Sequence, residues 1–268
     1  MSAVPQADQP FVLHDERGGV VTLTLNRPQQ LNLLTTGMLD ALQAALDAVA
    51  KDPSARVVVL AGAGKAFCAG HDVKEIQALA EQPKIEALFH TCSRMMQTLT
   101  ALPQPVIARV HGVAAAAGCQ LVAQCDLAVA SDAAKFTTPG VTWGFFCSTP
   151  GVAVGRNVSR KRAMEMLLTG DLVDARTALE WGLVNRVVPG DSLDAEVAVL
   201  AGKITAKPPR TIAAGKQAFY RQMDMGVEGA YALASNVIAC SFADEEGREG
   251  SAAFIEKRPP RWTKPDRE

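Results

Sequence analysis

The chain has 268 residues, with 27 Lys or Arg against 28 Asp or Glu and a formal net charge of −1. This length can bury a full core, whereas the balanced charge offers no field that would attract nucleic acid, and the apolar runs are too short to span a membrane. The first twenty residues lack the basic and apolar regions of a signal peptide, so we expect a cytoplasmic protein with no membrane partner.

The first hundred residues alternate between strand and helix patterns. Val20–Leu25 alternates and is rich in β-branched residues, which predicts a strand, and residues 38–49 carry apolar side chains at helical spacing. Val57–Leu60 predicts a second strand. Phe67–Asp72 (FCAGHD) is a turn of small residues that leads toward another helix, and Ile85–Leu102 has a helical pattern that ends at prolines.

The central stretch Pro105–Asp126 combines a predicted buried strand, Val106–Val110, with four alanines, Gly118 and an apolar helical segment. The first amides of a helix have no intrahelical partner, and the helix dipole makes that end positive. Such a turn can hold an anion or a developing oxyanion. The alternative is simply close packing of a helix on a sheet.

The rest of the chain first continues the alternation and then becomes helical. Strands are predicted at Leu127–Ala130 and Val184–Val188, and helices at Arg160–Leu168, Ala175–Trp181 and Leu193–Thr205. Beyond Pro208 the chain is compatible with helix to Lys257, with breaks expected near Gly226 and Gly247.

This order of elements predicts an α/β fold. We divide the chain into an N-terminal extension (1–18), a core (19–200), a C-terminal helical region (201–258) and a tail (259–268). The helical region is too apolar to stand alone, so it must pack on this subunit or on a neighbour. Its candidate apolar face consists of Val227, Tyr231, Ala234, Val237 and Ile238.

The six cysteines and four histidines show no metal-ligand spacing. We therefore expect no metal site and free thiols. For Cys119 and Cys125, packing is favoured over nucleophilic chemistry, because nothing in the sequence supplies an activating base.

The two small-residue turns, Phe67–Asp72 and Ala114–Gln120, each follow a strand and lead into a helix. If adjacent strands bring the turns together, each can contribute one backbone amide to a pair of donors. Two such donors are what a thioester carbonyl needs when it becomes an enolate or a tetrahedral oxyanion.

At this point the chain resembles the crotonase superfamily, the enoyl-CoA hydratase/isomerase family. The resemblance runs from Val20 to about Trp262 and rests on six motifs in order: Asn26–Pro28 with Leu31-Asn32, Lys65–Asp72, Pro105–Asp126, Phe136–Pro139, Ala163–Asp171 and Gly182–Pro189. It implies a spiral of ββα units with a C-terminal helical trimerisation region, assembled as a homotrimer or hexamer. It also implies acyl-CoA thioester ligands, with no cofactor beyond the coenzyme A of the substrate.

The resemblance also assigns roles by position. The donors of the oxyanion hole would be the amides of His71 and Ala117. The predicted substrate and CoA contacts, besides those two residues, are Arg27, Ala69, Asp72, Val73, Lys74 and Trp143, with Phe254 and Lys257 reaching the CoA of an adjacent subunit. Trp143, Thr138, Thr142, Cys147 and Ser148 are expected at the acyl end.

The chain departs from the family where hydratases carry two catalytic glutamates. Those positions are Gln120 and Gly140 here. A glutamine amide can orient water but does not exchange a proton near neutral pH, and glycine offers no side chain. The stretch Gly144–Val152 is also rewritten and should reshape the acyl pocket. This set of departures resembles the divergent branch of enoyl-CoA hydratase domain-containing proteins.

We therefore expect an acyl-CoA-binding protein of the hydratase/isomerase type, with the oxyanion hole retained and standard hydration weak or absent. A decarboxylase of malonyl-type thioesters and a non-catalytic acyl-CoA binder are the alternatives. Isomerisation or residual hydration would need another acid–base group, for which the side chain of His71 is a candidate because its reference pKa lies near neutrality. A structural interaction module would leave both turns unexplained.

Overall fold

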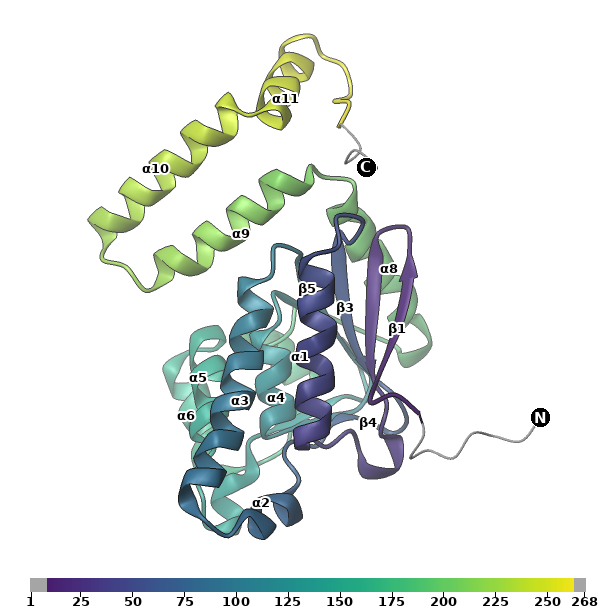
Figure 1. Cartoon of the computed structure of the whole chain (residues 1–268), viewed down its shortest axis with the longest axis vertical. Helices are drawn as coiled ribbons and strands as arrows, with labels where there is room; N and C mark the ends of the chain where they lie inside the picture. The colour runs from purple at the N-terminus through teal and green to yellow at the C-terminus, as the bar shows by residue number, and fades with distance from the viewer. Residues whose placement is uncertain (1–8, 263–268) are drawn as a thin grey trace, which may run out of the picture.

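The computed structural model describes residues 9–262, and two sheets form its body (Figure 1). The six-stranded sheet has the order β1-β2-β3-β5-β7-β10, with β1 antiparallel to β2 and the other neighbours parallel. Its strands are β1 Val12–Arg17, β2 Val20–Leu25, β3 Val57–Gly62, β5 Val106–Val110, β7 Leu127–Ser131 and β10 Arg186–Val188. The four-stranded sheet has the order β4-β6-β8-β9, made of β4 Ala66–Cys68, β6 Val113–Ala115, β8 Lys135–Thr137 and β9 Val173–Asp174.

The helices follow the strands in a repeating order. Each turn of the chain gives one strand to the large sheet and one to the small sheet before a helix begins, as in β3-β4-α2, β5-β6-α4 and β7-β8-α5. The expected α/β spiral of ββα units is therefore confirmed. The helices of the body are α1 Thr36–Ala50, α2 Val73–Leu79, α3 Gln82–Ala101, α4 Ala117–Gln124, α5 Ser148–Asn157, α6 Arg160–Thr169, α7 Ala175–Trp181 and α8 Leu193–Thr205.

Strand β3 shows why the sequence places these strands in the interior. All six of its residues (VVVLAG) are buried, as expected for a parallel strand covered on both faces. Val58 and Leu60 belong to the main core on the side of α1, α3 and α4, whereas Val57 and Val59 belong to a second cluster with α8. The alternation of strand side chains thus joins two helical layers through one sheet.

Three helices form the C-terminal region, which projects from one end of the body (Figure 1): α9 Pro209–Met223, α10 Val227–Ala243 and α11 Glu245–Ile255. The break near Gly226 is confirmed, because Gly226 precedes α10. The break near Gly247 is confirmed as well, since it falls at Asp244, three residues before the glycine. Asp244 ends α10 and caps α11, whereas Gly247 lies inside α11, where a β-carbon would come within 1.8 Å of the Ser241 carbonyl oxygen.

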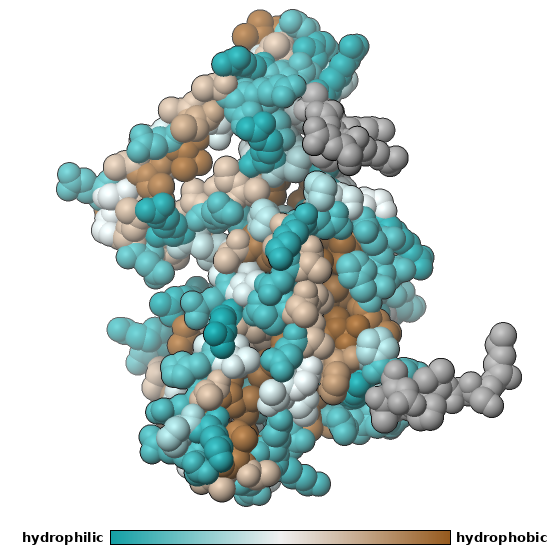
Figure 2. All heavy atoms as spheres, viewed as in Figure 1, coloured by the Kyte–Doolittle hydropathy of each residue, from teal (hydrophilic) through white to brown (hydrophobic). Residues whose placement is uncertain are grey.

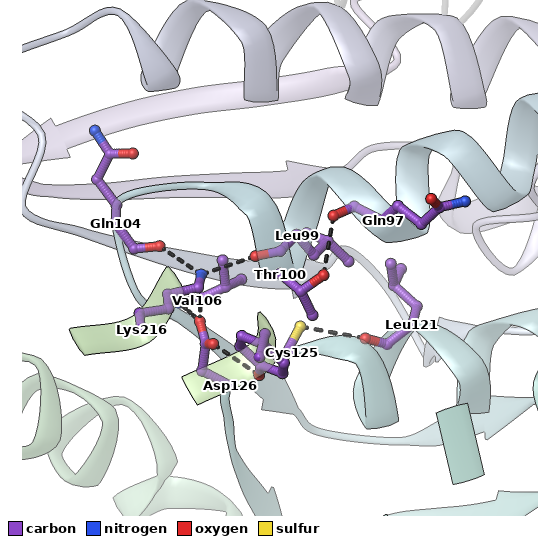
Figure 3. Close-up of polar contacts among 10 residues, drawn as sticks. Gln97, Leu99, Thr100, Gln104, Val106, Leu121, Cys125, Asp126 and Lys216 are labelled. Atoms are coloured by element: carbon purple, nitrogen blue, oxygen red, sulfur yellow. Dashed lines mark hydrogen bonds and ion pairs between the residues drawn. The ribbon is translucent and has the colours of Figure 1, made fainter. Parts of the chain in front are cut away.

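A buried ion pair fastens α9 to the body (Figure 3). The Nζ atom of Lys216 lies 2.7 Å from Oδ2 of Asp126 and donates hydrogen bonds to the carbonyls of Leu99 and Gln104. Asp126 also accepts hydrogen bonds from the Val106 amide and the Tyr220 hydroxyl. Burial lowers the pKa of Lys216, and the Asp126 carboxylate opposes this shift.

The structure differs from the sequence expectations mainly in short elements. Strand β1 falls within the expected N-terminal extension, so residues 12–17 are part of the large sheet. Strands β4, β6, β8 and β9 have two or three residues each and were not predicted. Helix α5 begins in the rewritten stretch after Gly144, where no helix was predicted. Residues 1–8 of the extension and 263–268 of the tail lie outside the described residues.

Candidate functional site

The two small-residue turns lie side by side because β4 and β6 are parallel neighbours. Gly70, with φ of +96°, comes so close to the second turn that a β-carbon on it would lie 3.0 Å from Cβ of Ala116. Gly118 is packed more tightly still, since a β-carbon there would lie 2.0 Å from the Cys68 carbonyl oxygen. Glycine at both positions is therefore what permits the turns to meet.

Both backbone polar groups of Leu34 form hydrogen bonds with the first turn. The Leu34 amide donates to the Gly70 carbonyl (2.8 Å), and Nδ1 of His71 lies 3.0 Å from the Leu34 carbonyl oxygen. Because a carbonyl only accepts, we assign the proton to Nδ1. Burial lowers the pKa of His71 despite this hydrogen bond, so the ring is neutral at pH 7. Its Nε2 is buried and has no partner among residues 9–262.

The second turn places the start of α4 against the first turn. Ala116 precedes the helix with φ of 48° and ψ of −116°, and Ala117 is the first helical residue. The Ala117 N–H has no intrahelical acceptor, as at the start of any α-helix. It lies near Gly70, since a β-carbon on that glycine would be 3.4 Å from the Ala117 nitrogen.

A cavity of about 480 Å³ opens beside both turns. Its walls come from the two turns, helices α2 and α3, the 3-10 helix at Pro139–Trp143 and the segment that follows it. The lining is mostly apolar, and among the described residues that form it there is no Asp, Glu, Lys or Arg. The lining residues are Ala69, His71, Val73, Ile76, Phe89, Ala116, Ala117, Pro139, Gly140, Trp143, Phe145, Phe146, Cys147, Ser148, Thr149 and Pro150.

Gly140 is enclosed by the segment that follows it. Its amide donates to Sγ of Cys147 at 3.3 Å, and a β-carbon on Gly140 would lie 2.5 Å from the Phe145 carbonyl oxygen. No side chain fits there unless the backbone of residues 145–147 moves. Burial raises the pKa of Cys147, while the Gly140 amide opposes that shift, so the sulfur remains a thiol.

Gln120 lies on α4 three residues after Ala117, which puts both side chains on one face of the helix. Gln120 is 4% exposed, and its Oε1 has no hydrogen-bond partner within the described chain. Buried polar atoms normally have a partner. Oε1 of Gln120 is therefore an exception to this rule, on the helix that begins at the second turn.

The cavity brings together six of the predicted site residues and leaves out the others. Ala69, His71, Val73, Ala117, Gly140 and Trp143 line it, as do Cys147 and Ser148 from the expected acyl end. Gln120, Thr138 and Thr142 do not line it.

The remaining predicted contacts lie elsewhere. Asp72 caps α2 through the amides of Lys74 and Glu75, while the Lys74 side chain is exposed. The Arg27 guanidinium donates to the carbonyls of Gln9 and Pro10. Phe254 and Lys257 belong to the exposed end of the C-terminal region.

Sequence reasoning did not single out four of the wall residues: Ala116, Ile76, Phe89 and Pro139. Phe145, Phe146, Thr149 and Pro150 lie in Gly144–Val152, the stretch that is expected to reshape the pocket. Ile76 lies three residues after Val73, so helical spacing could have found it. Nothing in the sequence distinguishes Phe89 from the apolar residues of α3 that face the core.

The buried thiols outside the cavity are unreactive, and no metal-binding cluster is found in the described residues. Burial raises the pKa of Cys68, Cys92 and Cys119 to about 12, so these thiols are protonated packing residues. In the described part of the chain, no group of three or more His, Cys, Asp and Glu side chains could hold a metal ion. Within the same residues, no helix is long and apolar enough to cross a membrane.

Comparisons with known proteins identify the family of this chain. The family model described as enoyl-CoA hydratase/isomerase matches residues 15–265. "Enoyl-CoA hydratase domain-containing protein 3, mitochondrial" is 45% identical in Xenopus laevis, over 95% of this chain and 86% of that protein, and 42% identical in human, over 91% and 81%.

Solved structures are similar over nearly their whole length. An enoyl-CoA hydratase of Mycobacterium smegmatis has a TM-score of 0.93 and 53% identity, covering 95% of this chain and 99% of that one. The human enoyl Coenzyme A hydratase domain-containing protein 3 has a TM-score of 0.91 and 40% identity, covering 95% and 100%.

Proposed function

The chain belongs to the enoyl-CoA hydratase/isomerase family, and we propose that it binds acyl-CoA thioesters with the thioester carbonyl between the amides of His71 and Ala117. The observation that carries this proposal is the meeting of two small-residue turns at the wall of an apolar cavity of about 480 Å³. Two fixed N–H donors in a site that excludes water stabilise a developing oxyanion strongly. The apolar walls suit the acyl chain.

Hydration of an enoyl thioester is expected to be weak or absent. The reaction needs positioned acid–base groups that activate the water and transfer a proton. The loss of one such group typically reduces the rate by about 10²–10⁴-fold. Gly140 has no side chain, and the amide of Gln120 does not titrate near neutral pH. The buried Nε2 of His71 is shielded from solvent, so the imidazole is a poor substitute base.

The test uses two measurements on the purified protein. Isothermal calorimetry with a saturated acyl-CoA should give heat of binding, and absorbance should show consumption of a short trans-2-enoyl-CoA close to the background rate. Absence of binding would reject the proposal. An enzyme-like rate of hydration would keep the ligand but overturn the argument from the two missing glutamates.

Decarboxylation of a malonyl-type thioester is the second candidate, and the lack of charged side chains in the cavity wall favours it. In this reaction the bond between Cα and the carboxylate carbon breaks, CO₂ leaves, and its bonding electrons form the thioester enolate. The enolate oxygen would lie on the two amides, so no base is needed before CO₂ leaves. An apolar wall also offers no counter-charge to the carboxylate of the bound substrate, which raises the free energy of that substrate and favours loss of CO₂. Release of CO₂ from an alkylmalonyl-CoA tests this candidate, and binding without turnover of either substrate would indicate a non-catalytic binder.

A homotrimer or hexamer is the proposed assembly. Figure 2 shows apolar surface along α9 and α10. The large apolar side chains that are exposed on α9, α10 and α11 in the single chain include Phe219, Met223, Val227, Tyr231, Ile238, Phe242, Phe254 and Ile255. Covering them in an assembly would remove this surface from water. Contact of Phe254 and Lys257 with the CoA of a neighbouring subunit, and a cytoplasmic location, stay predictions.

A further inference from the structure

Ala116 has an unusual backbone conformation for a residue with a side chain. Its φ of 48° and ψ of −116° correspond to the second residue of a type II′ turn, a position that normally requires glycine. An alanine in this conformation is strained. Such strain persists only where the surrounding structure holds the residue in place, and it often occurs at functional sites.

Hydrogen bonds on both sides hold Ala116. Its N–H donates to the Thr137 carbonyl of the small sheet (2.9 Å), and its carbonyl accepts from the backbone N–H of Gln120 in α4 (3.0 Å). One peptide group is thus fixed to the sheet and the next to the helix. The two torsions of Ala116 therefore define the angle at which β6 meets α4, and with it the direction of the Ala117 N–H.

The methyl group of Ala116 has a second effect, because it lies against Gly70. A β-carbon on Gly70 would be 3.0 Å from Cβ of Ala116, so the methyl group fills the space between the two turns. His71 directly follows Gly70 in the chain. The size of residue 116 therefore sets the spacing between the turns that carry the amides of His71 and Ala117.

We propose that Ala116 is a positioning residue for carbonyl binding: its strained backbone directs the Ala117 amide, and its methyl group keeps the two donor turns apart. This inference rests on the proposed binding of a thioester carbonyl between those amides. Glycine at position 116 would adopt the same torsions without strain, but it would widen the range of torsions and remove the spacer. A gain in stability should then accompany a loss of carbonyl polarisation.

The experiment measures thermal unfolding and the absorbance of bound cinnamoyl-CoA, whose spectrum shifts to the red when its carbonyl is polarised. Ala116→Gly should raise Tm by about 2–5 °C, at least halve the red shift and weaken binding about three- to tenfold. Ala116→Ser keeps the β-carbon and should keep the red shift of the wild type. Ala80→Gly is the matched control, because Ala80 also has positive φ (56°) but lies exposed at the end of α2; it should gain stability without changing the red shift.

A full red shift in Ala116→Gly, or an equal loss in Ala80→Gly, would overturn the positioning role. Failure of the proposed function is distinguishable, because it would appear in the wild type as absent binding or binding without a red shift. Either result would remove the ligand and this inference together.

Discussion

The sulfur of Cys147 occupies the space that a side chain at Gly140 would need. The Gly140 amide donates to Sγ at 3.3 Å, and a β-carbon at position 140 would lie 2.8 Å from that sulfur and 2.5 Å from the Phe145 carbonyl oxygen. The space beside Gly140 is therefore filled by residues 145–147, which follow it in the chain. This part of the cavity wall leaves no room for a side chain at position 140.

Gly140→Ala should destabilise the protein by about 1–3 kcal/mol, because the methyl group overpacks a region bounded by backbone. The matched control is Gly155→Ala, in helix α5, where a β-carbon would meet nothing within 4 Å. That change should be neutral or stabilise by up to about 1 kcal/mol. Chemical denaturation of the two variants checks the difference, and equal stabilities would contradict the packing argument.

Gln120→Glu should lower stability without restoring hydration by more than about tenfold. The carboxylate would be buried without a protein partner, which raises its pKa and disfavours its charged form. The second glutamate of a hydratase cannot be added at position 140 without moving residues 145–147. Gln120→Leu is the control, since an apolar side chain replaces an unpaired buried amide and should leave Tm unchanged or higher. Thermal unfolding and the enoyl-CoA assay together check this prediction, which a strongly active Gln120→Glu variant would contradict.

Lys216→Met should destabilise the folded chain by about 3–5 kcal/mol, because it leaves Asp126 buried without its cation. Lys216→Met combined with Asp126→Asn should recover part of that loss, since no unpaired charge remains. The exposed pair of Arg17 and Asp15 supplies the control, and Arg17→Met should change stability little. Denaturation curves at pH 7 measure all three variants. A single Lys216→Met change as mild as the surface control would contradict this account.

Stability should fall as the pH drops below about 6.5, the ordinary pKa of histidine. Burial lowers the pKa of both His71 and His111 in the folded protein. Below pH 6.5 the unfolded chain therefore binds more protons than the folded chain, and unfolding becomes easier. His71→Gln should reduce the slope of stability against pH by up to one proton, measured between pH 5 and 7.5. An unchanged slope would show that His71 is not buried in its neutral form.

Light scattering should give a mass of three or six chains for the wild type. Tyr231→Glu and Ile238→Glu should reduce that mass, because each places a charge in the apolar surface of α10, where Tyr231 and Ile238 are 72% and 56% exposed in the single chain. Leu13→Glu, on β1, replaces another exposed apolar residue and should leave the mass unchanged. A monomeric wild type would reject the assembly.

The longer elements were predictable from sequence because each has a clear period. The strands at Val20–Leu25 and Val106–Val110 match β2 and β5, and the helix patterns match α1, α3 and α6 through α8. The strands of the small sheet could not be found this way, because two or three residues carry no measurable period. The break between α10 and α11 was found to within three residues: it falls at Asp244, whereas Gly247 lies inside α11 and permits the close approach of the Ser241 carbonyl.

The candidate site was predictable where it depends on backbone and not where it depends on side chains from distant elements. The meeting of the two turns follows from parallel pairing of their strands. Arg27 illustrates the limit, because its motif implied a ligand contact while its guanidinium donates to the carbonyls of Gln9 and Pro10. Asn32, from the same motif, is fully buried and donates to the carbonyls of Ala66 and Phe67, where the first turn begins. The motif therefore holds the backbone at the start of the first turn and does not line the cavity.

The attachment of the C-terminal helices has a consequence for the order of folding. Helix α10 has no buried residue in the single chain, α9 has only Lys216, and Glu246 of α11 binds the amides of Arg210 and Thr211 at the start of α9. These three helices therefore hold one another more than they hold the body. Amide hydrogens there should exchange as one cooperative unit, well before those of β3 and β5. The body can therefore form before α9–α11 dock on it, and if the proposed assembly forms, it would add stability to these three helices last.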